Sequence, residues 1–441
     1  MELEDKIERM LSLLKKRKVD EFEIFVSATD FINAESKAKS LNSLSRSRES
    51  GIGLRVVREG AFGFAYGDEP DDNLVESALA SAKAQFTDPY NVIPGPSGEY
   101  TDVNAYDENV EAVDAEYCIE RAIELETSAF ETDPRVNKVR KASFSRAHKV
   151  IRIVNSKGID ASSKTTLLRA SIMVTAAEDS DVQAGFDFDQ SHFIDGLDVR
   201  EVGRRAANMA VGMLGAKHIN TTRMPALFER NSAAEFLSYM AGSFSGEAIA
   251  KGKSYLADKL GKRIFSPGIV IVDDPTVTGA SDASSFDGEG VPSRRNVLVE
   301  DGVLKGFVYN TYWGMFSGKE STGNSVRSNY RDIPLLAVRH LCMEPSGDGL
   351  EEILQGLKTV FKITDIMGMH TADSITGEFS VGVNGFILER GEAIYPVREA
   401  AISGNIYDML SRILAVGNDS RGFGSVSTPS FVVDTIDISG K

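Results

Sequence analysis

Apolar residues recur along the first half of the chain in two similar series of helical and alternating spacing. The first series predicts a helix, two extended segments, a hairpin and a second helix, at residues 1–18, 21–28, 33–44, 51–68 and 70–86. Glu59-Gly60 stands where the hairpin turns. A Pro/Gly-rich connector at residues 88–98 separates this series from the next one.

The second series begins at residue 114 and repeats the order of the first. It predicts a helix, four strands and a helix, at residues 114–130, 139–144, 149–154, 165–176, 182–188 and 199–214. Helix, four strands and helix, twice over, indicate a duplicated α/β layer with possible internal repeats at 1–90 and 114–216. We therefore predict an N-terminal α+β domain over residues 1–218.

The second half, residues 219–441, is richer in strands than in helices. Asp301-Gly302 and Arg390-Gly391 each join two alternating segments, which predicts two hairpins. Further strands are predicted at 269–272, 335–343, 361–369 and 430–440, with short helices near 350–357 and 404–414. The pattern predicts a mainly-β sandwich or barrel-like domain with a few helices, and an α+β fold class for the whole chain.

A helix predicted over residues 232–250 is the most distinctive element of this half. Ser232 and Glu235 have the spacing of a capping box, which indicates its start. Small residues recur on one face at Ser238, Gly242 and Gly246. A glycine inside a helix costs about 1 kcal/mol relative to alanine, so we expect a close approach of a neighbouring element, a partner chain or a ligand. A tightly packed core helix is the simplest interpretation.

Two aspartates, Asp273 and Asp274, follow the predicted strand at residues 269–272. Adjacent carboxylates can act as acid/base groups or as metal ligands. At the end of a strand, however, aspartate more often forms a turn, because its side chain bonds to backbone groups ahead of it.

The charge balance excludes some partners. Lys+Arg 49 against Asp+Glu 65 gives a net charge of −16, which disfavours attraction to nucleic-acid phosphates. No apolar run is long enough to cross a bilayer, and the opening residues lack the pattern of a secretory signal. We expect a cytoplasmic protein with no direct contact to DNA or membrane.

No motif in the residues identifies an enzyme. The 5 histidines and 2 cysteines, Cys118 and Cys342, form no metal-ligand pattern. Gly252-Lys253-Ser254 lacks both the spacing and the preceding strand of a phosphate loop.

Two long polar loops, at residues 276–296 and 321–334, are candidates for binding instead. Candidate substrate-channel or interface residues are Arg294, Arg295, Asn296, Asn324, Arg327, Asn329 and Glu378. Arginine and asparagine side chains suit carbonyls and carboxylates, although solvated or internally bonded loops explain them equally well.

Several segments together resemble the TldD/PmbA family. They are GKSYLADKLG with IVIVDDP, GEGVPSRRNVLVEDGVLKGFVYN, STGN, ITGEFSVGVNGF, GEAIYPVREAAISGN and AVGNDS, in order over nearly the whole second half. The chain looks more like the PmbA type, also called TldE, than the TldD type. The resemblance implies a cytoplasmic TldD–TldE assembly that acts as a zinc-dependent peptidase on peptides or unfolded proteins.

The family pattern also shows where this chain departs from it. The TldD-type chain carries a helical H-E-x-x-x-H motif and a cysteine near the C-terminus as zinc ligands. Alignment on the downstream G-x-S places that motif on Leu237, Ser238 and Gly242, and the stretch after residue 419 has no cysteine. The resemblance therefore implies a subunit without a cofactor of its own, paired with a zinc-bearing TldD-type chain or with itself.

Two other hypotheses stay open from the sequence. The family names also refer to modulation of DNA gyrase, which suggests a regulator or binding protein without enzymatic activity. An independent hydrolase could instead use carboxylates such as Asp273, Asp274 or Glu378.

Overall fold

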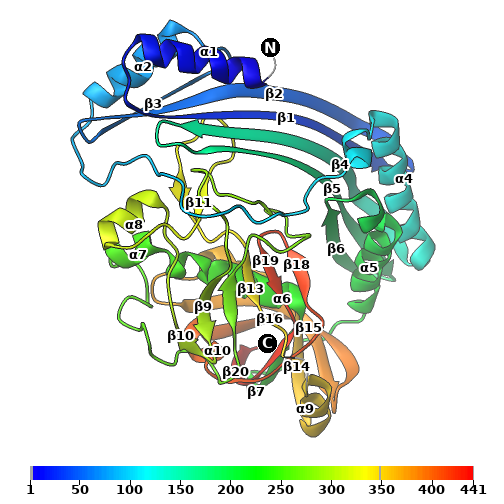
Figure 1. Ribbon diagram of the computed structural model, residues 1–441. Coiled ribbons are helices and arrows are strands. Elements are labelled where there is room, and N and C mark those ends of the chain that lie inside the picture. Colours follow the sequence, from blue (N-terminus) through cyan, green and yellow to red (C-terminus); the bar gives the residue numbers. More distant parts are fainter. Residues whose placement is uncertain (1–2, 347–348, 441) are drawn as a thin grey trace.

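The computed structural model describes residues 3–346 and 349–440, and its N-terminal half is built on one antiparallel sheet. The strands are β1 (Glu21–Lys37), β2 (Ser40–Arg58), β3 (Ala61–Gly67), β4 (Val136–Asn155), β5 (Asp160–Glu178) and β6 (Asp181–Ser191), in the order β3-β2-β1-β4-β5-β6. The helices are α1 (Leu3–Lys16), α2 (Asp72–Lys83), α3 (Glu108–Glu111), α4 (Ala115–Thr132) and α5 (Val199–Gly212). The long helices cover the outer face of the curved sheet, and its other face looks toward the second half (Figure 1).

The layer is duplicated as helix, three strands and helix, and the two units join where β1 pairs with β4. The same close contact recurs in both units. A Cβ on Gly63 in β3 would lie 2.2 Å from the carbonyl oxygen of Ala78 in α2, and one on Gly185 in β6 would lie 2.1 Å from that of Ala206 in α5. Glycine is therefore required at both places, because any side chain would push the helix off the strand.

Each unit has three strands rather than the predicted four, because the predicted short strands are continuous. Residues 139–144 and 149–154 belong to the single strand β4, and β1 runs on to Lys37. The turn between β1 and β2 lies at Ala38 and Lys39, with φ of 55° and 56°. Alanine and lysine do not favour the left-handed backbone conformation of such a turn. The turn at Ala38 and Lys39 was not predicted for that reason.

The predicted hairpin turns are confirmed by their backbone angles. Both residues of each turn have positive φ, as a type I′ turn requires. The φ values are 54° and 78° at Glu59-Gly60, 48° and 70° at Asp301-Gly302, and 50° and 86° at Arg390-Gly391.

The C-terminal half contains a barrel-like sheet, a second mixed sheet and a few helices. The barrel-like sheet holds β7 (Thr222–Phe228), β14 (Thr359–Met367), β15 (Glu378–Glu389), β16 (Glu392–Asn405), β17 (Ile413–Val416) and β20 (Phe431–Ser439). Its order is β16-β15-β14-β7-β20-β17, and β16 also pairs with β20. This last pairing closes a ring of strands, in agreement with the predicted barrel.

The second sheet has the order β10-β9-β8-β13-β19-β18. Its strands are β8 (Ile271–Asp273), β9 (Asn296–Glu300), β10 (Val303–Leu304), β13 (Leu341–Met343), β18 (Arg421–Phe423) and β19 (Val426–Thr428). A separate pair consists of β11 (Ser325–Val326) and β12 (Leu335–Leu336). The predicted strand at residues 335–343 is thus two short strands in different sheets, because residues 337–340 leave the ladder to bond elsewhere.

The helices of this half are α6 (Arg230–Met240), α7 (Gly246–Ala250), α8 (Thr311–Ser317), α9 (Leu350–Gly356) and α10 (Ile406–Leu410). The helix predicted near 350–357 is found as α9, whereas the two predicted over 232–250 and 404–414 are shorter than expected. The predicted helix at 404–414 is only α10, because residues 413–416 pair with β20 as β17. No helix in the described part of the chain is both long and apolar enough to span a membrane.

The predicted helix over residues 232–250 is broken into α6, a 3₁₀ turn at Ala241–Phe244 and α7. Its cap is Glu229, whose side chain accepts from the backbone N–H of Asn231, whereas the Ser232 hydroxyl donates to the Glu229 and Ile363 carbonyls. Ser245 is extended, with ψ of 127°, and this ends the helical path.

The two halves meet around Tyr330, which is 2% exposed. A Cβ on Gly51 would lie 2.3 Å from the ring of Tyr330, and one on Gly53 would lie 2.4 Å from its carbonyl oxygen. Because Gly51 and Gly53 have no side chain, Tyr330 from the second half can pack directly against this segment. Phe25 and Phe286 belong to the same buried cluster.

Candidate functional site at the junction of the two halves

The polar loops converge on Asp273, which is completely buried within β8 rather than in the turn after it. Its Oδ1 accepts from the backbone N–H groups of Arg339 and His340 at 2.7 and 2.8 Å. Its Oδ2 accepts from Asn324 Nδ2 at 2.6 Å. Burial raises the pKa of Asp273, and these three donors oppose that shift by stabilising the carboxylate. The interpretation of Asp273 as a turn-former was wrong, because it organises the loops around β8.

Asn296 and Asn324, both predicted site residues, belong to this network. Asn296 Nδ2 donates to the Thr322 carbonyl at 3.1 Å and to Asn324 Oδ1 at 3.2 Å. Arg294 is exposed and donates to the carbonyls of Ser321 and Thr322. These side chains therefore hold the loops together, and their hydrogen-bonding groups are used within the protein.

Two other predicted residues lie apart from that network. Arg295 forms an ion pair with Glu344 at 2.5 Å, with both side chains more than 40% exposed. Asn329 accepts from the Arg331 backbone N–H at 2.8 Å and shapes its own loop.

Arg327 belongs to a buried group of four charges that we call the junction clamp: Glu23, Arg55, Glu289 and Arg327. Arg55 bonds Glu23 at 2.6 Å and Glu289 at 2.7 Å, and Arg327 pairs with Glu23. All four side chains are at most 6% exposed. Glu23 and Arg55 come from β1 and β2, whereas Glu289 and Arg327 come from the loops of the second half. The clamp therefore ties the halves together with balanced charge.

The clamp is also held by its surroundings. The guanidinium of Arg327 lies 4.9 Å from the centre of the Phe25 ring, and Glu289 accepts from the Thr311 backbone N–H at 3.1 Å. Burial favours the neutral form of Glu23, but Arg327 and Arg55 outweigh it and hold the pKa of Glu23 below its ordinary value. Glu23 is consequently ionised in the folded protein.

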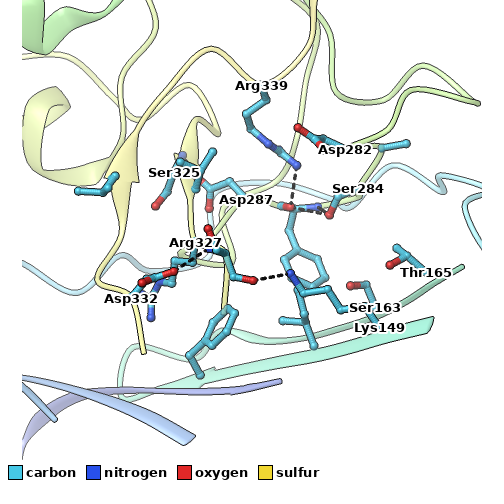
Figure 2. A pocket seen from close by; sticks show the side chains of 18 of the residues that line it. Lys149, Ser163, Thr165, Asp282, Ser284, Asp287, Ser325, Arg327, Asp332 and Arg339 are labelled. Atoms are coloured by element: carbon cyan, nitrogen blue, oxygen red, sulfur yellow. Dashed lines mark hydrogen bonds between the residues drawn. The ribbon is translucent and has the colours of Figure 1, made fainter. Parts of the chain in front are cut away.

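Beside the clamp lies a cavity of about 430 Å³, the junction cavity, between the inner face of the sheet and the loops of the second half (Figure 2). Lys149 on β4 and Ser163 and Thr165 on β5 line one side. The other side carries acidic and hydroxyl groups from both polar loops, including Asp282, Ser284, Asp287, Ser325 and Asp332, together with Arg339 from the segment that follows them.

Asp287 is the most strongly perturbed acid in the junction cavity. Burial and the nearby charge of Glu289 raise the pKa of Asp287 to about 7. Backbone N–H groups of Glu289, Val291 and Ser325 donate to its two oxygens at 2.8, 3.0 and 2.9 Å. A carboxyl group that titrates near neutrality can exchange protons, but these donors fix its position as part of the loop.

The basic groups of the cavity are mostly engaged. Lys149 Nζ donates to the Ser328 carbonyl at 2.9 Å, and burial lowers its pKa. Arg339 donates to Ser293 Oγ at 2.6 Å and to the Phe286 carbonyl at 3.3 Å. The Ser325 hydroxyl, in contrast, is buried and has no hydrogen-bond partner among the described residues. This hydroxyl can donate a hydrogen bond to a bound molecule or accept one from it.

The carboxylates named for an independent hydrolase do not form one group. Asp274 Oδ1 accepts from the Thr276 backbone N–H at 3.0 Å, which confirms the turn interpretation for this residue. Glu378 is exposed on β15 of the other sheet, where Asn405 Nδ2 donates to it at 3.1 Å. With Asp273 fully bonded in the core, these acids provide no paired general acid and base.

The three positions of the degenerate metal motif differ in environment. Leu237 is completely buried in the core, and Ser238 is exposed. Gly242 faces open space, since an added Cβ would meet nothing within 4 Å, and it lines a groove of about 360 Å³ together with residues 336–338. Gly246 has a packing reason instead, because its Cβ would lie 2.2 Å from the Tyr309 ring.

A zinc ion does not fit these residues. Zinc takes histidine, cysteine or carboxylate ligands, and leucine, serine and glycine stand at the three positions. Within residues 3–346 and 349–440 no three His, Cys, Asp or Glu side chains lie close enough together to hold a metal ion. Burial raises the pKa of Cys118 to about 11 and that of Cys342 to about 12, so both thiols stay protonated at neutral pH.

Sequence reasoning missed most of the charged groups at the junction. Arg327 was a candidate, but its partners Glu23, Arg55 and Glu289 were not, and neither were Asp287 and Lys149. The Asp287-Gly288-Glu289 segment offered a local signal, as acids flanking a glycine in a loop without periodicity. Glu23 and Arg55 gave none, because both lie in ordinary strand patterns.

Three family models match the chain in succession. The PmbA/TldA metallopeptidase domain 1 matches residues 22–84, the central domain residues 108–214 and the C-terminal domain residues 221–440.

Relatives of both types match over most of their length. The metalloprotease PmbA homologue of Haemophilus influenzae is 26% identical, over 95% of this chain and 92% of its own. The metalloprotease TldD homologue of the same species is 25% identical, over 89% and 87%. TldE from Thermococcus kodakarensis shares the fold with a TM-score of 0.91 and 25% identity, over 98% of this chain and 100% of that one. With models, relatives and fold in agreement across both halves, the chain belongs to the PmbA/TldD metallopeptidase family.

Proposed function

We propose that this chain is a PmbA/TldE-type subunit that works with a zinc-bearing TldD-type chain to cleave peptides or unfolded proteins in the cytoplasm. The observation that carries the proposal is the chemistry at Leu237, Ser238 and Gly242. Hydrolysis by zinc requires three protein ligands, an open coordination position and a base. Side chains of these three types cannot supply them.

The contribution of this chain is to bind and position the substrate beside the active partner. The junction cavity supports this role, because it combines hydroxyls with a carboxyl group that titrates near neutrality. Peptide backbones offer one donor and one acceptor per residue, and hydroxyls such as that of Ser325 can meet either. The groove beside Gly242 leaves space at the surface for an extended segment.

The test is to purify this chain alone, a TldD-type chain from the same genome alone, and the two after co-expression. Zinc is measured in each sample, and cleavage is followed with a fluorogenic peptide and with casein. We expect less than about 0.1 zinc per copy of this chain, stable co-purification, and chelator-sensitive cleavage that requires the TldD-type chain. A pair in which the TldD-type chain lacks its zinc-binding histidines is the matched control and should be inactive.

Metal-dependent cleavage by this chain alone would sink the proposal. So would equal activity of the TldD-type chain with and without this one. A pull-down that recovers DNA gyrase and no TldD-type chain would instead favour the regulator hypothesis.

A further inference from the structure

A second cavity lies between β6 and α5 of the first half and α6, β14 and β15 of the second. Its volume is about 540 Å³, larger than that of the junction cavity. Phenylalanine side chains and four methionines form its apolar walls, and we call it the methionine cavity. The methionines are Met173, Met209, Met213 and Met367. Methionine side chains are unbranched and flexible, so they adapt to ligands of different shapes.

The charged groups that line the methionine cavity among the described residues are all carboxyl groups. Glu235 enters from α6 and Asp365 from β14. Asn231 Oδ1 is buried without a hydrogen-bond partner. The Asp365 carboxylate accepts from Asn384 at 3.3 Å, and Glu235 forms no ion pair with a described residue. The cavity therefore presents two carboxyl groups to an occupant, with an unused carbonyl oxygen in its wall.

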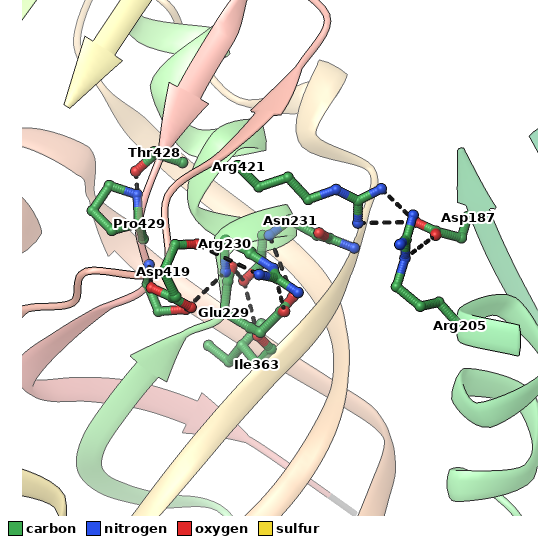
Figure 3. Close-up of polar contacts among 12 residues, drawn as sticks. Asp187, Arg205, Glu229, Arg230, Asn231, Ile363, Asp419, Arg421, Thr428 and Pro429 are labelled. Carbon is green, nitrogen blue, oxygen red and sulfur yellow. Dashed lines mark hydrogen bonds and ion pairs between the residues drawn. The ribbon is translucent and has the colours of Figure 1, made fainter. Parts of the chain in front are cut away.

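No lysine, arginine or histidine lines this cavity among the described residues. A third carboxylate, Asp187, is already neutralised (Figure 3). Arg205 bonds one of its oxygens at 2.6 Å and Arg421 bonds the other at 3.1 Å. Arg230, next to Asn231, contacts Glu229 at 3.4 Å. Arg205, Arg421 and Arg230 thus contact other acids, and no ion pair of Glu235 or Asp365 is found among the described residues.

This lack of cations has an electrostatic consequence. Burial, followed by the charge of Asp365, raises the pKa of Glu235, and burial raises the pKa of Asp365. Each raised pKa means that the carboxylate form is disfavoured in the free protein. A cation bound between them would reverse that effect, and the free energy gained would contribute to its affinity.

We propose that the methionine cavity binds a lysine or arginine side chain carried on an apolar peptide segment. The aliphatic part of such a side chain packs against the methionines, and its charged end reaches Glu235 and Asp365. A volume of about 540 Å³ lies within the range of sites that enclose small ligands.

This inference adds a substrate class to the proposed function, but it does not require the TldD-type chain, because binding is a property of this chain alone. The two proposals can therefore fail separately. The probe is a fluorescein-labelled peptide of six leucine, phenylalanine and alanine residues with one central lysine. Its matched control has norleucine in place of lysine. Fluorescence anisotropy measures both dissociation constants with the full chain at pH 8.

We expect the lysine peptide to bind about tenfold more tightly than the norleucine peptide, as one charge-assisted hydrogen bond would provide. The double variant Glu235→Gln and Asp365→Asn keeps the shape of both side chains and should abolish that preference. Glu392→Gln, at an exposed position on β16, is the matched control and should leave it intact. The single variant Glu235→Asp keeps the charge and should retain a reduced preference.

Four outcomes would overturn the inference. The first is that neither peptide binds, and the second is equal binding of the two peptides. The third is a preference that survives in the double variant while its circular dichroism spectrum and melting temperature match those of the wild type. The fourth is that a TldD-type chain displaces the peptide and buries the cavity, in which case the site is instead a subunit interface.

Discussion

The junction clamp and the methionine cavity both bring carboxylates to the contact between the two halves, but they treat the charge in opposite ways. The clamp carboxylates are buried, whereas Glu235 in the cavity is half-buried and Asp365 is exposed. In the clamp, Glu23 and Glu289 each meet a guanidinium at bonding distance. In the cavity, Glu235 and Asp365 meet no guanidinium among the described residues. In the clamp, the ion pairs hold the two halves together. The cavity keeps disfavoured charges within reach of solvent, an arrangement typical of sites that bind a ligand.

The largest expected effect is from Glu23→Gln, which breaks the clamp. It leaves Arg55 and Arg327 buried with one carboxylate between them, and breaking a buried pair in this way costs about 3–5 kcal/mol. The free energy of unfolding from urea titration measures the loss. Glu49→Gln is the matched control, because its pair with Arg331 is 39% and 48% exposed and should contribute less than about 1 kcal/mol. Equal losses in the two variants would remove the distinction between clamp and surface pair.

A second prediction concerns Asp287, next to the clamp. Its pKa of about 7 in the folded protein lies above the ordinary value of 3.8. Between these values the folded protein binds more protons than the unfolded chain, so stability falls as pH rises through that window and is constant above it. From pH 5 to 7 the expected fall is at most about 3 kcal/mol, at 1.36 kcal/mol for each pH unit.

Asp287→Asn should remove most of this slope. The quantity compared is the slope of the free energy of unfolding against pH in wild type and variant. Histidines with lowered pKa contribute equally to both slopes and cancel in the difference. Burial lowers the pKa of His148 and of His340, and their contributions run in the opposite direction. An unchanged slope in the variant would mean that Asp287 is ionised throughout.

A third prediction uses the two glycines on which helices rest. Gly185→Ala and Gly63→Ala should each cost about 1–3 kcal/mol, because each forces a helix off its strand. Gly185 lines the methionine cavity and Gly63 does not. Only the Gly185 variant should therefore weaken binding of the lysine peptide. A matching loss in the Gly63 variant would show that binding merely follows stability.

The smallest effect is expected from the double variant Glu235→Gln and Asp365→Asn. Its free energy of unfolding at pH 8 should equal that of the wild type or exceed it by less than about 1 kcal/mol, because two disfavoured charges are removed. Urea titration under the conditions used for Glu23→Gln makes the two regions directly comparable. A large loss would reveal a structural role for these acids and would weaken the contrast with the clamp.

Local signals explain which parts of the fold could be predicted. The hairpins at Asp301-Gly302 and Arg390-Gly391 followed from turn residues that favour positive φ. The helix over residues 232–250 was wrong because its apolar spacing continues through Ser245, whose extended backbone is set by surrounding contacts. The merged strand β4 was missed because the pattern weakens at residues 145–148, where the strand is held by its neighbours on both sides.

The candidate site was less accessible to sequence reasoning for a related reason. Asn296 and Asn324 were predicted site residues, and they do lie in one network. That network is built around Asp273, which the sequence analysis interpreted as a turn-former. Glu23, the ion-pair partner of Arg327, lies 304 positions away in the sequence, and nothing local marks it. The methionine cavity collects residues from β5, β6, α5, α6, β14, β15 and β18. Only the packing of the two halves brings them together.

The closing strand β20 also bears on how the chain acquires its structure during synthesis. In the first half, each unit of the duplicated layer is made of consecutive hairpins and neighbouring helices, so it can form soon after it leaves the ribosome. The ring of strands in the second half has no such route. β7 pairs with β20, and the Arg230 backbone N–H donates to Ser430 Oγ, which lies 200 residues later in the chain. Until β20 is made, β7 and β16 each present an unpaired edge that a chaperone must protect or another chain could capture.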